Sequence, residues 1–385
     1  MGVAPAPVGA TPVGTTEGTH VTIASVARVA EASLQVVADL QLPNGAYPAS
    51  PDFVAYRGYC WFRDGSFIAD GMSAAGAPAS ATRFFGWCAA TIGQHADRMT
   101  AAVEAARAGT PLDDEAMLPA RFTFDGGLGL DPWWDFQLDG YGTWLWALVA
   151  HLRRHHLPAE PYLPAVRLTV DYLVSSWHRP CFDWWEEHAE RVHVSTLGCI
   201  GAGLEAVLAA DLLDDGRASG ARAAASGIRT LVRSQGTVDG HLTKWVGRSD
   251  VDGSLAALVA PLGWISPDDP VATATVAAIE DTLADDLGVH RFADDVFYGG
   301  GRWPLLTAFH GMARLAIGDE AGARADLDWI ASTATDEGLL PEQVSDRLIV
   351  PDALPRWTER WGAVATPLLW SHGEYLRLWD ALGRP

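Results

Sequence analysis

The sequence is poor in the residues that bind polyanions. It has 27 lysines and arginines against 48 aspartates and glutamates in 385 residues, and Lys244 is the single lysine. Nucleic acids and anionic membrane surfaces are bound through clustered basic side chains. The net charge of −21 therefore disfavours both as partners.

Cysteines and long apolar runs are also scarce. The spacing of the four cysteines matches no zinc or redox motif, so we expect buried hydrophobic thiols and neither a metal nor a cofactor. No stretch approaches the roughly 18 apolar residues that a membrane span needs. The first 20 residues are rich in Pro, Ala, Gly and Thr and lack the basic start and apolar core of a secretory signal. We predict a disordered tail over 1–20 and a cytoplasmic protein.

Several catalytic signatures are missing as well. The sequence contains no G-x-S-x-G elbow, no phosphate-binding P-loop and no H-E-x-x-H zinc motif. The pairs Asp113-Asp114 and Asp294-Asp295 could bind a magnesium diphosphate, as in an all-helical terpene enzyme. However, both pairs are predicted to lie in loops rather than on facing helices, which disfavours that class.

What the sequence does show is helical periodicity along nearly its whole length. From Val21 to Leu40, for example, apolar residues recur every three or four positions, which indicates one buried helix face. The alternation typical of strands is nowhere sustained. We predict about twelve helices, near 21–41, 64–75, 79–108, 139–154, 160–178, 192–213, 217–234, 250–262, 270–286, 304–317, 319–334 and 360–382.

The connections between these helices alternate between short turns and long loops. Consecutive antiparallel hairpins place every second connection at the same end of a bundle. The sequence therefore predicts an all-α (α/α)6 barrel of six hairpins, with one catalytic domain over 21–385. The long loops, gathered at one end, cover 42–63, 109–138, 179–191, 235–249, 287–303 and 335–359.

Tryptophan is abundant, with 17 residues. Aromatic faces stack on the apolar faces of sugar rings, and two carboxyl groups can handle the protons of glycoside hydrolysis, so loops rich in both residue types favour sugar chemistry. We expect rim positions for Trp61, Trp133, Trp134, Trp184, Trp185, Trp245, Trp303 and Trp357. We expect core or helix packing for Trp87, Trp144, Trp146, Trp177, Trp264, Trp329, Trp361, Trp370 and Trp379.

Four segments, each in or next to a long loop, carry a family resemblance. YCWFRDGSF (59–67), FDWWEEH (182–188), HRFADDVFYGGGRW (290–303) and LLPEQVS (339–345) resemble, in order, motifs of glycoside hydrolase family 15, the glucoamylase family. The resemblance extends from about residue 20 to the end of the chain. The catalytic domain of that family is an (α/α)6 barrel, which agrees with the fold expected from periodicity.

The resemblance implies a role for each matching residue. Glu186 corresponds to the general acid and Glu342 to the general base of an inverting mechanism, in which the two carboxyl groups stand about 6.5–9.5 Å apart. We expect burial to raise the pKa of Glu186 while Glu342 stays ionised. The implied substrate-binding residues are Trp61, Arg63, Asp64, Trp133, Trp185, Glu187, Arg291 and Trp303, with Trp134 in place of Trp133 if the alignment shifts by one.

Departures from the family pattern bear on the substrate. We expect neither a β-sandwich before the barrel nor a starch-binding module after it. Arg302 stands where fungal relatives have proline, so we also expect a different acceptor subsite beside Trp303. Short α-1,6-linked glucosides such as isomaltose are the expected substrates. Maltose, malto-oligosaccharides and trehalose remain alternatives. An inverting disaccharide phosphorylase and a non-catalytic sugar-binding protein are more distant ones. The sequence predicts no oligomeric state.

Overall fold

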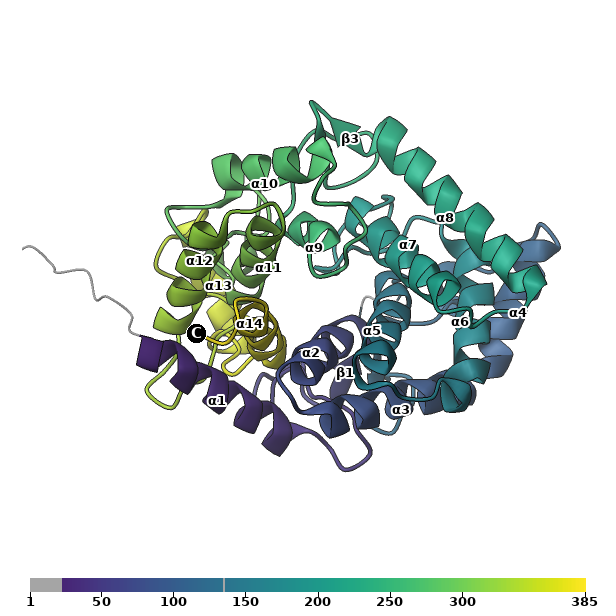
Figure 1. Ribbon diagram of the computed structural model, residues 1–385, viewed down its shortest axis with the longest axis horizontal. Helices are drawn as coiled ribbons and strands as arrows, with labels where there is room; N and C mark the ends of the chain where they lie inside the picture. Colours follow the sequence, from purple (N-terminus) through teal and green to yellow (C-terminus); the bar gives the residue numbers. More distant parts are fainter. Residues whose placement is uncertain (1–22, 134–135) are drawn as a thin grey trace, which may run out of the picture.

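A computed structural model describes residues 23–133 and 136–385, and these residues form an (α/α)6 barrel (Figure 1). The tail predicted for 1–20 lies outside the described residues. The described helices are α1 (Ile23–Leu40), α2 (Phe62–Ala74), α3 (Pro78–Gln94), α4 (Ala96–Arg107), α5 (Asp139–His155), α6 (Leu163–Ser176), α7 (Val194–Ala209), α8 (Asp215–Gln235), α9 (Ala256–Val259), α10 (Pro270–Leu283), α11 (Pro304–Ala316), α12 (Glu320–Ser332), α13 (Leu354–Trp361) and α14 (Leu369–Ala381). Two short strand pairs, β1 (Tyr59–Trp61) with β2 (Arg121–Thr123) and β3 (Thr237–Val238) with β4 (His241–Leu242), lie in the long connections.

The inner wall of the barrel is a closed ring of helices. Helix α2 packs on α5, α5 on α7, α7 on α9, α9 on α11, and α11 on α14, which returns to α2 (Figure 1). Every residue of α2 is buried, as an inner helix surrounded by others requires. Glycines allow the closest approach, because a Cβ on Gly71 would lie 2.1 Å from the carbonyl oxygen of Gly373 in α14. The ring confirms the predicted barrel.

Three predicted helices differ from those observed. The helix expected over 79–108 is divided at His95, whose backbone leaves helical geometry and whose ring contacts the carbonyl oxygen of Gly126 at 2.8 Å. The helix expected over 250–262 is reduced to α9 and a preceding 3₁₀ turn. The Asp252 side chain caps that turn at Ser254, and Pro261 follows shortly after the last residue of α9.

The last predicted helix, 360–382, is also wrong. Helix α13 ends at Trp361 because Gly362 adopts a positive φ of 89°, and α14 begins only at Leu369 after Pro367. The intervening turn changes the direction of the chain. This redirection brings tryptophans at both helix ends to the loop end of the barrel.

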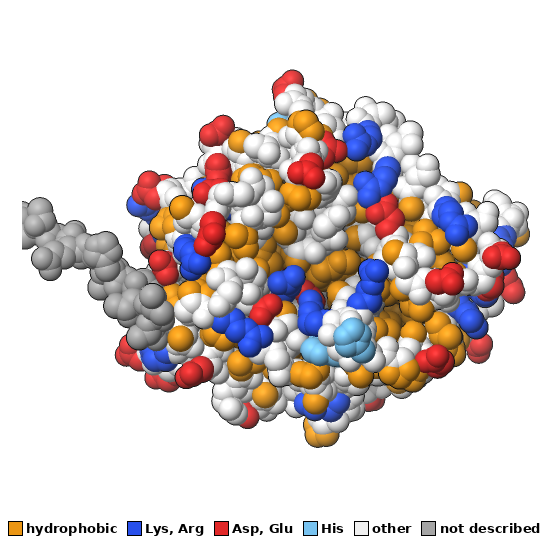
Figure 2. Space-filling view, viewed as in Figure 1, with side chains coloured by type: hydrophobic (Ala, Val, Ile, Leu, Met, Phe, Trp, Pro, Cys, Tyr) orange, Lys and Arg blue, Asp and Glu red, His pale blue; other side chains and the backbone are white. Residues whose placement is uncertain are grey.

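An ion triad joins three inner helices at the end opposite the long loops. Asp70 of α2 accepts hydrogen bonds from Arg154 of α5 and Arg377 of α14, each at 2.9 Å. In the view of Figure 2, basic side chains gather over α2, α5 and α14, while acidic side chains lie mostly toward the periphery. Arginines near the C-terminal ends of inner helices complement the negative ends of the helix dipoles.

Other features of the described chain agree with its composition. Cys60, Cys88, Cys181 and Cys199 are buried and free. Among the residues that the structure describes, no helix is long and apolar enough to cross a membrane. The cytoplasmic location stays a prediction.

A buried histidine links three helices of the barrel wall. His310 of α11 lies between the carboxylates of Asp326 in α12, at 3.0 Å, and Glu280 in α10, at 3.5 Å. Burial opposes a charge on this ring, but the hydrogen bond to Asp326 and the nearby carboxylate of Glu280 outweigh it and raise the pKa of His310 above 6.5. The contacts with His310 and Arg314 lower the pKa of Glu280 to about 2.

We expect His310→Gln to destabilise the fold by about 1–3 kcal/mol, and we expect this loss of stability to be larger at low pH than at high pH. Because folding raises the pKa of His310, its contribution is complete below pH 6.5 and is lost as the pH rises through the folded value. Urea unfolding of both proteins at about pH 6 and about pH 9 measures this. A difference in unfolding free energy that is larger at the higher pH would contradict the assignment.

Candidate active site

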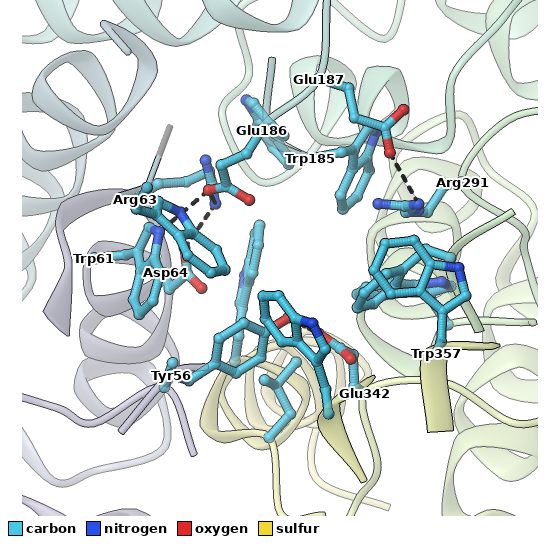
Figure 3. A pocket seen from close by; sticks show the side chains of 18 residues that line it. Tyr56, Trp61, Arg63, Asp64, Trp185, Glu186, Glu187, Arg291, Glu342 and Trp357 are labelled. Atoms are coloured by element: carbon cyan, nitrogen blue, oxygen red, sulfur yellow. Dashed lines mark hydrogen bonds and ion pairs between the residues drawn. The ribbon is translucent and has the colours of Figure 1, made fainter. Parts of the chain in front are cut away.

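The long connections enclose a deep cavity at their end of the barrel (Figure 3). Ten of the residues predicted for the site line it together. They are Trp61, Arg63, Asp64, Trp133, Trp185, Glu186, Glu187, Arg291, Trp303 and Glu342. Trp134, the alternative to Trp133, lies outside the described residues.

The structure adds aromatic residues that the sequence did not single out. Tyr56, Phe297, Trp361 and Trp370 also line the cavity, together with Trp184 and Trp357. Trp361 and Trp370 lie on helices and pack in or against the core, as predicted, and each also presents part of its ring to the cavity. Trp245, expected on the rim, instead packs against the rings of His188 and His193.

Glu186 lies in a tight turn that follows α6. Its φ is 55°, a value that non-glycine residues seldom adopt, so surrounding contacts must hold the turn in place. Three side chains donate hydrogen bonds to Glu186 Oε1. The donors are Trp61 Nε1 at 3.2 Å, Gln137 Nε2 at 3.2 Å and Arg63 Nη2 at 3.5 Å. Burial raises the pKa of Glu186 to about 7, opposed by Arg63 and reinforced by Asp64, so this carboxyl can hold a proton near neutral pH.

Glu342 lies across the cavity from Glu186 (Figure 3). It comes from the connection after α12, its side chain is buried, and the Tyr56 hydroxyl donates to its Oε1 at 2.6 Å. Among the described residues, Oε2 has no hydrogen-bond partner. One carboxylate oxygen is therefore held in place and the other is available to a polar group in the cavity.

The ionisation of Glu342 differs from our expectation. Burial raises its pKa to about 8, despite the Tyr56 hydrogen bond and Arg291, and the charges of Asp64 and Glu186 add to the rise. The expectation that Glu342 is ionised at neutral pH is therefore wrong. Because the charge of Glu186 contributes to the raised pKa of Glu342, the ionisation states of the two carboxyl groups are linked.

Arg63 and Asp64 form the polar floor of the cavity. Both lie in the first turn of α2, which places them at the loop end of the inner ring. Arg63 contacts Asp64 at 3.1 Å and Asp139 at 3.0 Å, and its guanidinium lies 5.1 Å from the ring centroid of Trp370. Burial raises the pKa of Asp64 against the opposing effect of Arg63.

A second arginine stands on the opposite wall. Arg291 Nε donates to Asp295 Oδ2 at 2.8 Å, and Nη2 reaches Glu187 Oε1 at 3.3 Å. Its guanidinium lies within 5.4 Å of the ring centroids of Trp185 and Trp303. Burial raises the pKa of Glu187, opposed by Arg291. Charged groups set among aromatic rings are suited to bind the hydroxyls and the apolar faces of a sugar.

Arg302 does not line the cavity. It donates to the carbonyl oxygen of Asp285 at 3.0 Å and pairs with Asp346, while its guanidinium lies over Trp329. Arg302 thus joins neighbouring loops, and the expectation of a different acceptor subsite beside Trp303 stays a prediction. In the described part of the chain, no group of three or more His, Cys, Asp or Glu is arranged to hold a metal ion.

Comparisons with known proteins agree with this geometry. A family model for glycosyl hydrolases family 15 matches residues 29–326. The chain is 51% identical over 362 residues to isomaltose glucohydrolase of Kribbella flavida, covering 94% of each protein. A solved wild-type glycosidase superposes with a TM-score of 0.91 and 51% identity, over 94% of this chain and 98% of that one. A bacterial glucoamylase complexed with acarbose, at 20% identity, shares the fold with a TM-score of 0.74 over 92% of this chain and 55% of its own length.

Proposed function

Because the chain belongs to glycosyl hydrolase family 15, we propose that it is an exo-acting, inverting α-glucosidase that releases β-glucose from short α-1,6-linked glucosides. Isomaltose is the proposed principal substrate, supported by the 51% identity to isomaltose glucohydrolase over 94% of both chains. The observation that carries the proposal is the pair of carboxyl groups, Glu186 and Glu342, that face each other across a cavity lined with aromatic rings. We also propose that residues 21–385 form one catalytic domain in a cytoplasmic enzyme.

In the proposed mechanism, Glu186 acts as the general acid and Glu342 as the general base. Glu186 protonates the glycosidic oxygen as the bond breaks, while Glu342 takes a proton from a water that attacks the opposite face of the sugar. Attack from the opposite face converts an α-glucoside into β-glucose. Arg63 and Asp64 bind hydroxyls of the glucose, and Arg291 with Glu187 binds polar groups on the other wall.

The productive form carries a proton on Glu186 and none on Glu342. The Tyr56 hydroxyl favours this form, because its hydrogen bond stabilises the carboxylate of Glu342. The unpartnered Oε2 of Glu342 is the oxygen that would accept the proton from water. Tyr56 thus offsets part of the rise in the pKa of Glu342 that burial causes.

A continuous row of aromatic rings along the cavity supports a short substrate. Trp133 from the second long connection packs against Trp361 from the sixth with centroids 5.4 Å apart, and Trp361 packs against Trp357 at 6.4 Å. Trp357 in turn packs on Phe297 at 5.0 Å. This wall of rings leaves the acceptor sugar bounded on one side, which suits a disaccharide better than a polymer.

Incubation with isomaltose, maltose, panose and trehalose, followed by ¹H NMR of the first sugar released, tests the proposal. We expect β-glucose to appear first and isomaltose to be hydrolysed fastest. Initial release of α-glucose would refute inversion, and faster hydrolysis of maltose or trehalose would reassign the linkage. Turnover that requires inorganic phosphate would indicate a phosphorylase, and binding without glucose release would indicate a sugar-binding protein.

A further inference from the structure

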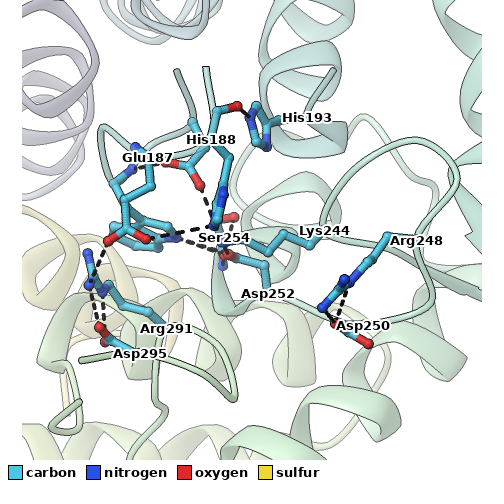
Figure 4. Close-up of polar contacts among 12 residues, drawn as sticks. Glu187, His188, His193, Lys244, Arg248, Asp250, Asp252, Ser254, Arg291 and Asp295 are labelled. Atoms are coloured by element: carbon cyan, nitrogen blue, oxygen red, sulfur yellow. Dashed lines mark hydrogen bonds and ion pairs between the residues drawn. The ribbon is translucent and has the colours of Figure 1, made fainter. Parts of the chain in front are cut away.

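The single lysine of the chain is buried behind the turn that carries Glu186, which we call the acid turn. Lys244 lies in the connection between α8 and α9, a connection from which no described residue lines the cavity. Its side chain is 5% exposed, and its Nζ lies 2.6 Å from Asp252 Oδ2 and 3.3 Å from Asp183 Oδ2 (Figure 4). The ammonium also stands 3.6 Å from the ring centroid of Phe292. A buried ammonium with two carboxylates and an aromatic face has its charge fully compensated.

Both aspartates hold the turn that carries Glu186. Asp183 Oδ1 accepts hydrogen bonds from the backbone N–H of Trp185 and of Glu187, each at 2.9 Å. Asp252 Oδ2 accepts from Trp185 Nε1, also at 2.9 Å. The residue between these anchored neighbours is Glu186, so the two aspartates fix the turn from both its backbone and its aromatic side chain.

The charge of Lys244 is what allows the two carboxylates to lie side by side. Burial alone would raise the pKa of Asp183, and the ammonium of Lys244, together with His193 and the two backbone hydrogen bonds, outweighs burial and lowers this pKa below its ordinary value. Without the ammonium, the two buried carboxylates would move apart or take up protons, since unpaired buried charges are costly. Either response changes the carboxylate oxygens that accept the hydrogen bonds of Trp185 and Glu187.

We propose that Lys244 is a positioning residue for the general acid: its ammonium joins Asp183 and Asp252 and so fixes the turn that directs Glu186 at the glycosidic oxygen. The inference rests on the proposed function. Lys244 itself does not touch the cavity, so its effect is transmitted through the two aspartates. Misplacing a catalytic group by about 1 Å can cost about 100-fold in rate, which sets the size of the expected effect.

The test compares Lys244→Met with Lys244→Arg on two substrates. The sugar that leaves isomaltose needs a proton from an acid. The fluoride ion that leaves α-glucosyl fluoride needs little such help. In Lys244→Met we expect kcat on isomaltose to fall about 100-fold and KM to change little, with less than about a tenfold fall on the fluoride. Lys244→Arg, which keeps the charge, should recover most of the kcat on isomaltose.

A matched control lies in the same connection. Arg248 pairs with Asp250 at 2.5 Å, but both side chains are more than 40% exposed and neither lines the cavity (Figure 4). Arg248→Met removes a basic side chain and an ion pair without touching the acid turn, and we expect its kcat to equal that of the wild type. Exposed pairs of this kind contribute little.

The double variant Lys244→Met/Asp252→Asn covers the case in which the single variant does not fold. It leaves only one buried carboxylate and keeps an acceptor oxygen for Trp185, and we expect the same selective loss on isomaltose. Folded variants with wild-type kcat on isomaltose, or with equal losses on both substrates, would overturn the inference. If the wild type hydrolyses isomaltose, the proposed function holds whichever result the variants give. If the wild type hydrolyses neither substrate, the proposed function itself is refuted.

Discussion

Replacing Glu186 by Gln lowers kcat on isomaltose by about 10²–10⁴-fold while KM stays within a small factor of the wild-type value, the range expected when a general acid is lost. The amide keeps the size of the side chain and an acceptor oxygen for Trp61 and Gln137, which bond the carboxyl in the wild type. It has no proton to deliver to the departing oxygen. Substrate binding therefore survives and bond cleavage does not.

Steady-state kinetics on isomaltose and α-glucosyl fluoride distinguish the loss of a general acid from a folding defect. The fluoride is expected to lose much less rate, because its leaving group needs little protonation. The wild type measured beside the variant gives the reference ratio of the two rates. Wild-type turnover of isomaltose by Glu186→Gln would remove Glu186 from the role of acid.

Replacing Glu342 by Gln has an equally large effect on turnover but a different signature. Without a base to accept a proton from water, kcat falls by about 10²–10⁴-fold on both substrates, since the attack by water is common to them. Equal losses on isomaltose and the fluoride thus separate the base from the acid. Retention of activity on both substrates would eliminate Glu342 as the base.

The same substitution is expected to stabilise the protein above neutral pH. Burial raises the pKa of Glu342 from 4.5 to about 8, so the folded protein binds a proton that the unfolded chain releases. The stability of the wild type therefore falls as the pH rises from 4.5 toward 8, and Glu342→Gln escapes this loss. The gain is on the order of a few kcal/mol at the upper end of that window.

Urea unfolding of wild type and Glu342→Gln at about pH 5 and about pH 8 measures the gain. Glu374 of α14 offers a matched control, because it is buried outside the cavity and burial raises its pKa well above 4.5. Glu374→Gln should gain stability in the same direction while keeping wild-type turnover. A stability difference for Glu342→Gln that does not grow with pH would show that its carboxyl is ionised in the folded protein.

Local sequence patterns determined the architecture and the identity of the charged site residues. The period of apolar residues reports a buried helix face without any knowledge of its partner, and the alternation of short and long connections implied a ring of hairpins. Arg63, Asp64, Glu186 and Glu342 were predictable as cavity residues because each stands in a segment that resembles a motif of glycoside hydrolase family 15. Loop tryptophans such as Trp303 were found by the same reasoning.

Contacts between segments distant in sequence decided the rest. Tyr56 bonds Glu342, 286 positions away, and Trp361 packs against Trp133 in the wall of the cavity. The order of the two carboxyl pKa values depends on how deeply each group is buried and which charges surround it, and neither is encoded in a local pattern. The sequence showed Lys244 to be the single lysine, but only the packing of two connections places it between Asp183 and Asp252. Burial and electrostatics are properties of the assembled barrel, so the tertiary structure alone decided how the predicted residues work together.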